Sequence, residues 1–248
     1  MNVAGVVAAL DREARTLGVA VHRKAGVQIL ADGTLQAVSG MGCAAAGLAA
    51  RRLIDAGATA LVSWGMAGGL DPELEAGSIC LPREVVAPDG MRFAVSSSWR
   101  DALMAAIASS RPVASGALLT CMYPIAGVAA KAAARRETGA VAVDMESSAI
   151  AEVAAASHVP FMALRVIVDT ALDAIPAAVT AAGESGQVRI GRLLLGLARS
   201  PAQIVPLVRL ARRYHLAIRS LRAVGRLGRL GPPAMPDARG VRRSEYRG

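Results

Sequence analysis

The feature that most constrains this chain is the alternation of short apolar segments with segments of helical pattern. Helical patterns cover residues 43–56, 99–109, 126–136, 146–156 and 182–199. The apolar segments are expected to be strands, at residues 3–10, 36–38, 60–64, 78–81, 84–86, 117–120, 141–143 and 160–168. Strands that alternate with helices predict an α/β fold, in which helices flank a mostly parallel sheet on both faces. The length of 248 residues fits one large domain of this class.

The net charge of +9 is concentrated at the carboxyl end of the chain. Residues 189–248 contain 14 Arg and two acids, whereas residues 1–188 contain 14 basic and 17 acidic residues. A near-neutral body therefore carries a basic extension. We expect a catalytic domain over residues 1–200, a basic amphipathic helical extension over residues 201–230, and a disordered tail rich in Arg and Pro over residues 231–248.

The cysteines and histidines suggest neither a disulfide framework nor a metal site. Three widely spaced cysteines are typical of a reducing compartment, and the three histidines are isolated from one another. The chain begins with a short apolar strand that runs into charged residues, which is unlike a signal peptide. No segment matches the roughly 20 predominantly apolar residues of a transmembrane helix. We therefore expect a cytoplasmic protein that binds no metal.

Several chemically distinctive residues share one position in this layout. Glu13, the turn at residues 39–42, the turn expected at residues 65–69, and Asp169 each follow the end of an expected strand. Open α/β sheets bind their ligands at the edge formed by the carboxyl ends of the strands. The sequence therefore predicts one site at this edge, with Glu146 at the start of a nearby helix.

Each of these residues also has a purely structural interpretation, which remains open at this point. The helix dipole favours a carboxylate such as Glu146 near a helix start, and Asp169 can cap a turn. Arg165 lies in an apolar strand, so a buried carboxylate is expected to pair with it. The glycines at residues 65–69 can form a tight turn between a strand and a helix. The joint placement of these residues favours a site.

The same residues carry a family resemblance that covers roughly residues 3–200. The chain resembles the nucleoside phosphorylase and nucleosidase superfamily, and within it the methylthioadenosine/S-adenosylhomocysteine nucleosidases. The resemblance is specific at residues 5–13, 39–42, 67–72, 143–146 and 165–169. It implies a three-layer nucleoside phosphorylase-like fold, in which helices flank a twisted mixed, mostly parallel sheet.

The resemblance also implies a role for each matching residue. Asp169 matches the acid that donates a proton toward purine N7, a form of help typically worth about 10²–10⁴-fold in rate. Glu13 and Arg165 match the residues that hold and activate the attacking water. Glu146 matches the residue that binds the ribose hydroxyls, and Met145 packs on the sugar. The remaining substrate-binding residues implied are Asp144, Gly42, Met66, Ala67 and Gly68.

Departures from the family pattern concern the nucleophile and the substrate. Phosphorolytic relatives carry an Arg and a Ser where this chain has Ser63 and Met66, so the usual phosphate clamp is missing. The hydroxyl that orients the catalytic Asp is replaced by Val168, and residues 119–124 replace the usual purine-binding segment. Hydrolysis and phosphorolysis both remain open. No cofactor is expected, although phosphate can serve as a co-substrate.

A narrower resemblance concerns residues 138–147, residues 159–161 and the Arg-rich extension. These resemble the hopanoid-associated phosphorylase subfamily, which is linked to removal of adenine from adenosylhopane. That resemblance implies a lipid-linked nucleoside as substrate and a role in hopanoid biosynthesis. The alternatives are a methylthioadenosine/S-adenosylhomocysteine nucleosidase, another purine nucleoside phosphorylase, or a silent member that only binds a nucleoside.

The extension offers a second line of inference. Apolar residues recur every three or four positions in residues 206–224, and Arg occupies much of the remaining surface. Such a helix can lie on the inner face of an anionic membrane, or it can pack on the domain or on a second subunit. We expect no nucleic-acid partner, because the extension lacks interleaved aromatic residues and a known binding module. Relatives complete their active sites across an interface, so a homodimer or larger oligomer is also expected.

Overall fold

The computed structural model describes residues 3–108, 113–175, 204–228 and 230–232. Its strands are β1 (Ala4–Ala8), β2 (Ala20–Lys24), β3 (Val27–Leu30), β4 (Leu35–Val38), β5 (Ala60–Gly69), β6 (Ile79–Cys80), β7 (Glu84–Val86), β8 (Arg92–Ala94), β9 (Val113–Ala114), β10 (Ala117–Thr120), β11 (Ala140–Asp144) and β12 (Phe161–Asp169). Its helices are α1 (Asp11–Ala14), α2 (Cys43–Asp55), α3 (Ser97–Ala108), α4 (Val128–Thr138), α5 (Ser147–Ala156) and α8 (Ile204–Gly225).

All of these strands belong to one mixed sheet. Its main path runs β2-β3-β4-β1-β5-β11-β10-β7-β8, and β12 pairs with β5 and β6. The central pairs β4–β1, β1–β5 and β5–β12 are parallel, whereas the β2–β3 and β7–β8 hairpins at the two ends are antiparallel. The prediction of a mixed, mostly parallel sheet flanked by helices is therefore confirmed.

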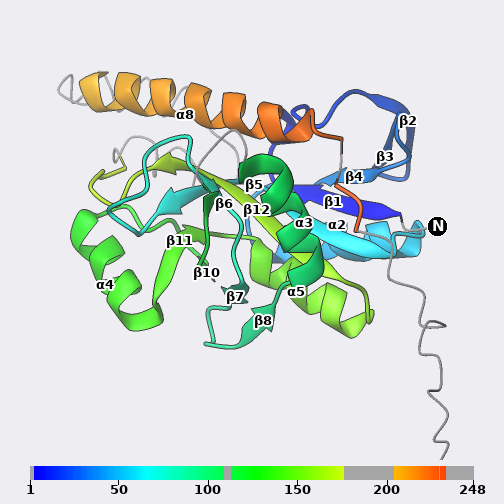
Figure 1. Cartoon of the computed structure of the whole chain (residues 1–248), viewed down its shortest axis with the longest axis horizontal. Helices are drawn as coiled ribbons and strands as arrows, with labels where there is room; N and C mark the ends of the chain where they lie inside the picture. Colours follow the sequence, from blue (N-terminus) through cyan, green and yellow to red (C-terminus); the bar gives the residue numbers. More distant parts are fainter. Residues whose placement is uncertain (1–2, 109–112, 176–203, 229, 233–248) are drawn as a thin grey trace, which may run out of the picture.

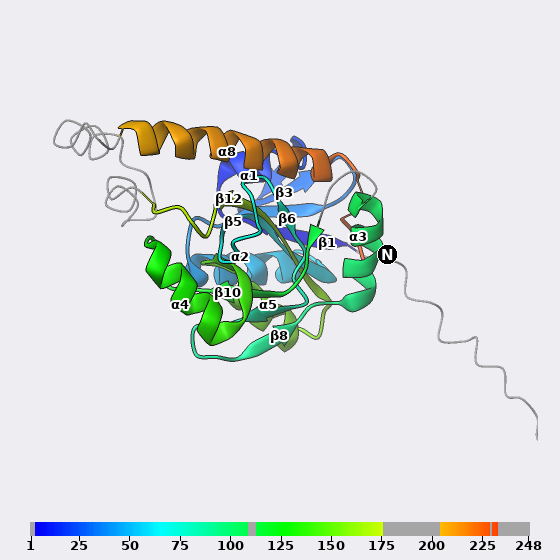
Figure 2. The same cartoon turned by 60° about the vertical axis from the view of Figure 1, so that its left-hand side comes forward.

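Helices cover the two faces of the sheet, and the apolar core consists of two large clusters and a smaller third one. Figure 1 shows α8 on one side of the sheet and α2 with α5 on the other, and Figure 2 shows the same layers from a second direction. Apolar residues of α2 and α5 pack on one face. Residues of α1, α3 and α8 pack on the other face, around the buried Trp64 and Trp99. Because both faces are covered, β1 is buried along its whole length.

The prediction of a turn at residues 65–69 is wrong. These residues continue β5, a strand of ten residues. It pairs with β12, and the last residue pair of that register is Gly68 with Asp169. The glycines allow side chains of other elements to approach the β5 backbone closely, and they do not change the direction of the chain. A Cβ atom at Gly65 would lie 2.5 Å from Nη1 of Arg165 and 2.8 Å from Oε1 of Glu13. Glycine in a strand often marks such crowding.

Other elements differ from prediction at their ends or were not predicted. Glu146 is the N-cap of α5 rather than a residue of its first turn, and α4 begins at Val128. Strands β2, β3, β8 and β9 were not predicted; β2 and β8 have mostly exposed side chains and lack the apolar pattern of a buried strand. The helix predicted at residues 182–199, and most of the tail at residues 231–248, lie outside the described residues.

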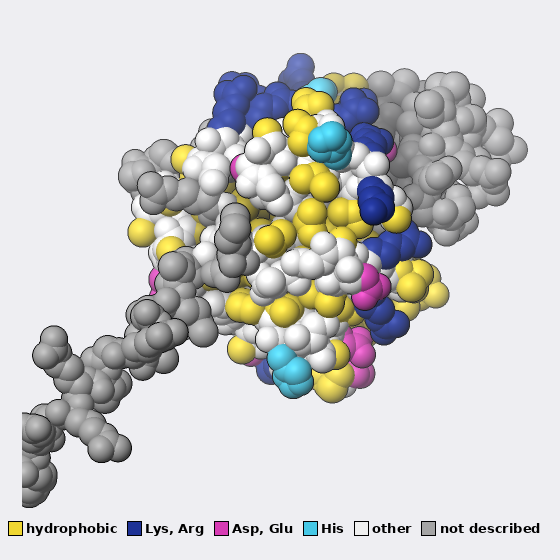
Figure 3. Space-filling model, turned by 90° about the vertical axis from the view of Figure 1, so that its right-hand side faces the viewer, with side chains coloured by type: hydrophobic (Ala, Val, Ile, Leu, Met, Phe, Trp, Pro, Cys, Tyr) yellow, Lys and Arg dark blue, Asp and Glu magenta, His cyan; other side chains and the backbone are white. Residues whose placement is uncertain are grey.

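The amphipathic helix predicted at residues 206–224 is present as α8. Ala217, Leu221 and Val224 are buried against the sheet, so the carboxyl half of α8 packs on the domain. The Arg side chains of its outer surface are exposed: Arg209, Arg212, Arg219 and Arg222. Figure 3 shows Lys and Arg gathered on the side of the molecule that carries α8. Among the described residues, no helix is long and apolar enough to span a membrane.

Candidate active site

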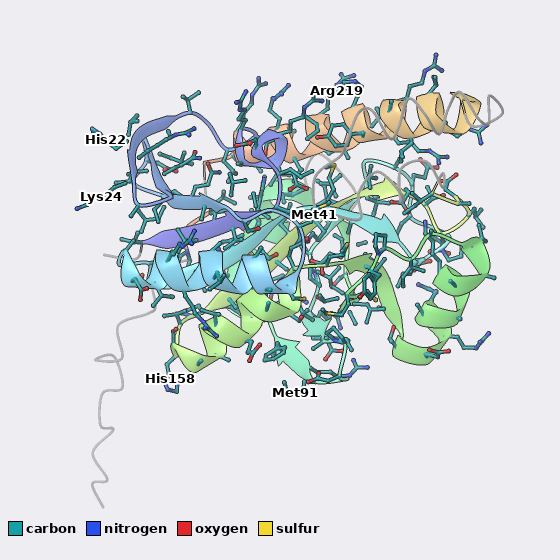
Figure 4. All side chains as sticks on the ribbon, turned by 180° about the vertical axis from the view of Figure 1, so that it is seen from behind. His22, Lys24, Met41, Met91, His158 and Arg219 are labelled. Atoms are coloured by element: carbon teal, nitrogen blue, oxygen red, sulfur yellow. The ribbon has the colours of Figure 1, made fainter. Side chains whose placement is uncertain are left out.

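A cavity of about 250 Å³ lies at the carboxyl edge of the sheet. Its wall is formed where β1, β5, β11 and β12 end, which is the edge that the sequence predicted. Predicted site residues that line it are Glu13, Met66, Ala67, Gly68, Asp144, Met145, Glu146 and Asp169. Met41, labelled near the amino end of α2 in Figure 4, lines the same cavity. The remaining two predicted residues, Gly42 and Arg165, do not line the cavity but contact residues that do.

Arg165 is the buried cation behind this cavity. Its guanidinium Nη2 lies 2.6 Å from Oδ2 of Asp144 and 3.8 Å from Oε2 of Glu146. The same nitrogen donates to the hydroxyls of Ser63 at 2.7 Å and Ser147 at 3.1 Å. Burial alone would lower the pKa of Arg165, but the surrounding carboxylates raise it, so the guanidinium stays charged.

Asp144 is the carboxylate partner that the isolated Arg165 required. Its Oδ1 accepts a hydrogen bond from the Thr120 hydroxyl at 2.8 Å, and both its oxygens face the backbone N–H of Ser147 at the start of α5. The Asp144 side chain is completely buried in this network. Although Asp144 borders the cavity, its Oδ2 pairs with Arg165 and its Oδ1 accepts from Thr120. The substrate-binding role implied for it therefore stays a prediction.

Glu13 is held by backbone donors on both of its oxygens. Oε1 accepts from the N–H of Met66 at 2.8 Å, and Oε2 accepts from the N–H of Leu10 at 3.0 Å. The second bond caps the amino end of α1, so the short helix fixes the orientation of the side chain. Burial raises the pKa of Glu13, while Arg165 and the backbone donors oppose that rise. A buried carboxylate of raised pKa is a better base than an exposed one.

Glu146 connects the cavity to the amino end of α2. Its Oε1 accepts from the backbone N–H of Gly42 at 2.9 Å, so Gly42 contacts a lining residue without lining the cavity itself. Gly42 has a φ of 96°, a left-handed conformation that favours glycine. Burial raises the pKa of Glu146 to about 7, against the opposing effect of Arg165. The side chain therefore titrates near neutral pH.

Asp169 ends β12 and pairs with a residue that the sequence analysis missed. The buried Lys131 of α4 forms an ion pair with its Oδ2. Burial raises the pKa of Asp169, and the ammonium of Lys131 opposes this. A sequence signal did exist, because Lys131 is one of two lysines in the chain and stands in an alanine-rich segment. Its helical position alone did not show that it points toward β12.

The comparison with protein families decides the classification. The model of the phosphorylase superfamily matches residues 29–199, more than half of the chain. The chain belongs to the phosphorylase superfamily. The predicted enzyme class, cleavage of N-glycosidic bonds, is confirmed at that level. No protein of the curated set matches the chain by sequence.

Solved structures share the fold of this superfamily member at low sequence identity. A methylthioadenosine/S-adenosylhomocysteine nucleosidase of Neisseria meningitidis is 20% identical, with a TM-score of 0.66, over 92% of this chain and 99% of that chain. The corresponding Helicobacter pylori nucleosidase is 19% identical, with a TM-score of 0.65, over 90% and 97%. Futalosine hydrolase of Helicobacter pylori is 20% identical, with a TM-score of 0.64, over 80% and 98%.

A larger cavity, of about 400 Å³, lies elsewhere on this phosphorylase superfamily protein. It is bordered by Leu70, Arg135 and Arg136 and contains none of the predicted site residues. Cavity size therefore does not select the candidate site, and the convergence of Glu13, Glu146 and Asp169 favours the cavity of about 250 Å³. Within the described residues, no group of three or more His, Cys, Asp or Glu side chains is placed to hold a metal ion.

Replacing Gly65 with Ala is expected to damage both folding and activity. The new methyl group would lie 2.5 Å from Nη1 of Arg165 and 2.8 Å from Oε1 of Glu13, and overpacking of a buried site typically costs about 1–3 kcal/mol. Denaturant unfolding and steady-state kinetics would measure both effects. Gly127→Ala is the matched control, because nothing lies within 4 Å of a Cβ there. Equal behaviour of the two variants would contradict the crowding argument.

Proposed function

We propose that this protein cleaves the N-glycosidic bond of a 5′-substituted adenosine and releases adenine, with adenosylhopane as its substrate. The observation that carries the proposal is the convergence of Glu13, Glu146 and Asp169 on one cavity, with the Arg165 cation behind it. Cleavage of such a bond needs a proton for the leaving base and negative groups near the sugar, where positive charge develops.

Each carboxyl group has a distinct role in the proposed reaction. Asp169 transfers its proton to purine N7 while the bond between C1′ and N9 breaks and its electron pair goes to the base. Glu146 accepts hydrogen bonds from the ribose hydroxyls, and Met145 packs on the sugar. Water attacks C1′ and gives its proton to Glu13, while Arg165 offsets part of the negative charge of Glu13 and Glu146. The products are adenine and the free sugar.

Water is the favoured nucleophile, because the groups that would hold phosphate are engaged elsewhere. Ser63 occupies the position of the family's clamping Arg, is buried, and bonds to Arg165 and Ser147. The N–H of Gly42, at the amino end of α2, donates to Glu146 and so is not free for an anion. Phosphorolysis needs such a preformed anion site.

Apolar residues around the cavity support a lipid-linked substrate. Met41, Tyr123 and Ile175 line it, and Tyr123 is 81% exposed. An apolar 5′ group would cover such surface. The exposed Arg side chains of α8 would place the protein at the inner face of an anionic membrane, where such a lipid resides. The proposal extends to a cytoplasmic location and to a homodimer or larger oligomer.

A methylthioadenosine/S-adenosylhomocysteine nucleosidase is the second candidate. The fold similarity to two solved nucleosidases of that name favours it. The two candidates share the proposed chemistry and differ only in the 5′ substituent. Residues 119–124, which include the cavity-lining Tyr123 and Pro124, depart from the family's purine-binding segment and favour the first candidate.

Adenine release from detergent-dispersed adenosylhopane, methylthioadenosine and S-adenosylhomocysteine tests the proposal. We expect the highest kcat/KM with adenosylhopane, and the same rate with and without phosphate. A preference for methylthioadenosine would select the second candidate, and a requirement for phosphate would identify a phosphorolytic enzyme. Release of adenine from none of the three by folded protein would refute the proposed function.

A further inference from the structure

Lys131 is a buried cation that the proposed reaction has not yet used. It is completely buried in α4, and its Nζ has three acceptors: Oδ2 of Asp169, the carbonyl oxygen of Thr170 at 2.7 Å, and that of Asp173 at 3.0 Å. An ammonium group has three donors and no acceptor. All three donors are therefore committed, and all point to the end of β12 and the turn that follows it.

This geometry distinguishes the two oxygens of Asp169. Because Nζ can only donate, Oδ2 can only accept, and in the acid form of Asp169 the proton must sit on Oδ1. Among the described residues, the only further donor to this carboxyl group is the backbone N–H of Asp169 itself. Asp169 borders the cavity, and Gly68 leaves space for its carboxyl group, since a Cβ atom there would lie 3.2 Å from Oδ2 and 3.5 Å from Oδ1. Oδ1 is thus the oxygen available to a substrate.

We propose that Lys131 is the positioning residue of Asp169, which fixes the acidic proton on Oδ1 and holds that oxygen toward the leaving base. The inference rests on the proposed function, because it assigns a role within the same reaction. Lys131 does not touch the cavity and acts through Asp169. The position before Asp169 is the apolar Val168, so orientation by a neighbouring hydroxyl is not available there.

The surrounding charges hold this arrangement in place. Asp173 accepts hydrogen bonds from the backbone N–H of Thr170 at 3.0 Å and from its hydroxyl at 2.5 Å, which closes the turn after β12. Arg213 of α8 forms an ion pair with the same Asp173 carboxylate. The charged groups near Asp169 are therefore Lys131 from α4 and Asp173 from the turn, and Arg213 neutralises the second.

The pKa of Asp169 agrees with this assignment. Burial raises it, which favours the protonated form that a general acid needs, and the cation of Lys131 keeps that rise in check. Removal of Lys131 would therefore raise the pKa of Asp169 further. A group that must be protonated loses activity as the pH rises through its pKa, so the alkaline limb of the kcat profile should move to higher pH in a Lys131→Met variant.

The decisive test compares two leaving groups. Adenine needs a proton to depart, whereas the nitrophenolate of p-nitrophenyl β-D-ribofuranoside departs without one. Lys131→Met should lower kcat for the adenosine substrate by about 10–100-fold, part of the effect of a general acid, and change kcat for the nitrophenyl riboside by less than about threefold. An equal loss with both substrates would show that Lys131 only maintains the fold, and would overturn the proposal.

Lys24→Met is the matched control, because Lys24 is the other lysine of the chain. It is exposed on β2, and Figure 4 shows it at the far side of the molecule, directed outward. We expect wild-type kinetics with both substrates from this variant. In an Asp169→Asn background, Lys131→Met should have no further effect on adenine release, because residues that act as a unit are not additive. A further drop there would contradict action through Asp169.

The outcomes separate this inference from the proposed function. If the wild-type protein releases no adenine, the proposed function fails before Lys131 is tested. If the wild-type protein is active and Lys131→Met keeps its rate and pH profile, only the inference fails. Should Lys131→Met not fold, the same comparison is made with Lys131→Gln, whose amide can donate or accept and so no longer fixes the proton on Oδ1. Equal losses with both substrates would again overturn the proposal.

Discussion

Asp169→Asn is expected to lower kcat for adenine release by about 10²–10⁴-fold, the usual contribution of a general acid. An amide of the same shape fills the space beside Gly68 but has no acidic proton for purine N7. It also loses the ion pair with Lys131. The change in KM should be much smaller than the change in kcat, because the proton transfer occurs only in the transition state. Ultraviolet detection of free adenine under saturating substrate measures the effect.

Asp101→Asn is the control for Asp169→Asn. Asp101 is an exposed carboxylate of α3 that pairs with the neighbouring Arg100, and it takes no part in the cavity. This variant should keep wild-type rates. The assignment of Asp169 as the acid fails if its Asn variant, shown to be folded by circular dichroism, retains more than about a tenth of the wild-type kcat.

Arg165→Met is expected to destabilise the protein by about 3–5 kcal/mol, the usual cost of breaking a buried ion pair by removing one partner. The variant would leave the fully buried Asp144 carboxylate without the cation that lies 2.6 Å from it. The hydroxyls of Ser63 and Ser147 would each lose a donor as well. Urea unfolding followed by circular dichroism measures the change in the free energy of unfolding.

Two further variants test whether the unpaired Asp144 carboxylate causes the loss of stability in Arg165→Met. Arg92→Met removes an Arg whose ion pair with Glu84 is half exposed, and it should cost no more than about 1 kcal/mol. Asp144→Asn combined with Arg165→Met removes the stranded charge while it keeps a group that can bond to Thr120. That double variant should be more stable than Arg165→Met alone. If it is less stable, the desolvated Asp144 is not what makes Arg165 necessary.

The site was predicted in part from the sequence. The isolated Arg165 in an apolar strand required a carboxylate partner, because an unpaired buried charge is too costly. That partner is Asp144, the last residue of β11. A second carboxylate, Glu146, lies only two residues further along the chain. Which of the nearby carboxylates would take this place depended on how β11 and β12 lie against β5. No spacing along the chain carries that information.

The glycines of residues 65–69 are a second case in which neighbours in sequence did not reveal the structure. Gly65 and Gly68 predicted a turn, because glycine usually marks one when only neighbours in sequence are considered. In the fold they are part of β5, and they are small because Glu13 and Arg165 crowd Gly65 while Asp169 crowds Gly68. The crowding side chains come from other elements, so the reason for the glycines is tertiary.

The sequence by itself determined the α/β class, the sheet edge at which the candidate site lies, and four of the charged residues that meet there, Glu13, Glu146, Arg165 and Asp169. Those follow from periodicity and from the order of strands, which are local properties of the chain. Tertiary structure alone decided that Lys131 pairs with Asp169 and that the carboxyl half of α8 packs on the sheet. A helix presents several faces with similar composition, and only packing against a particular neighbour selects the one that is buried.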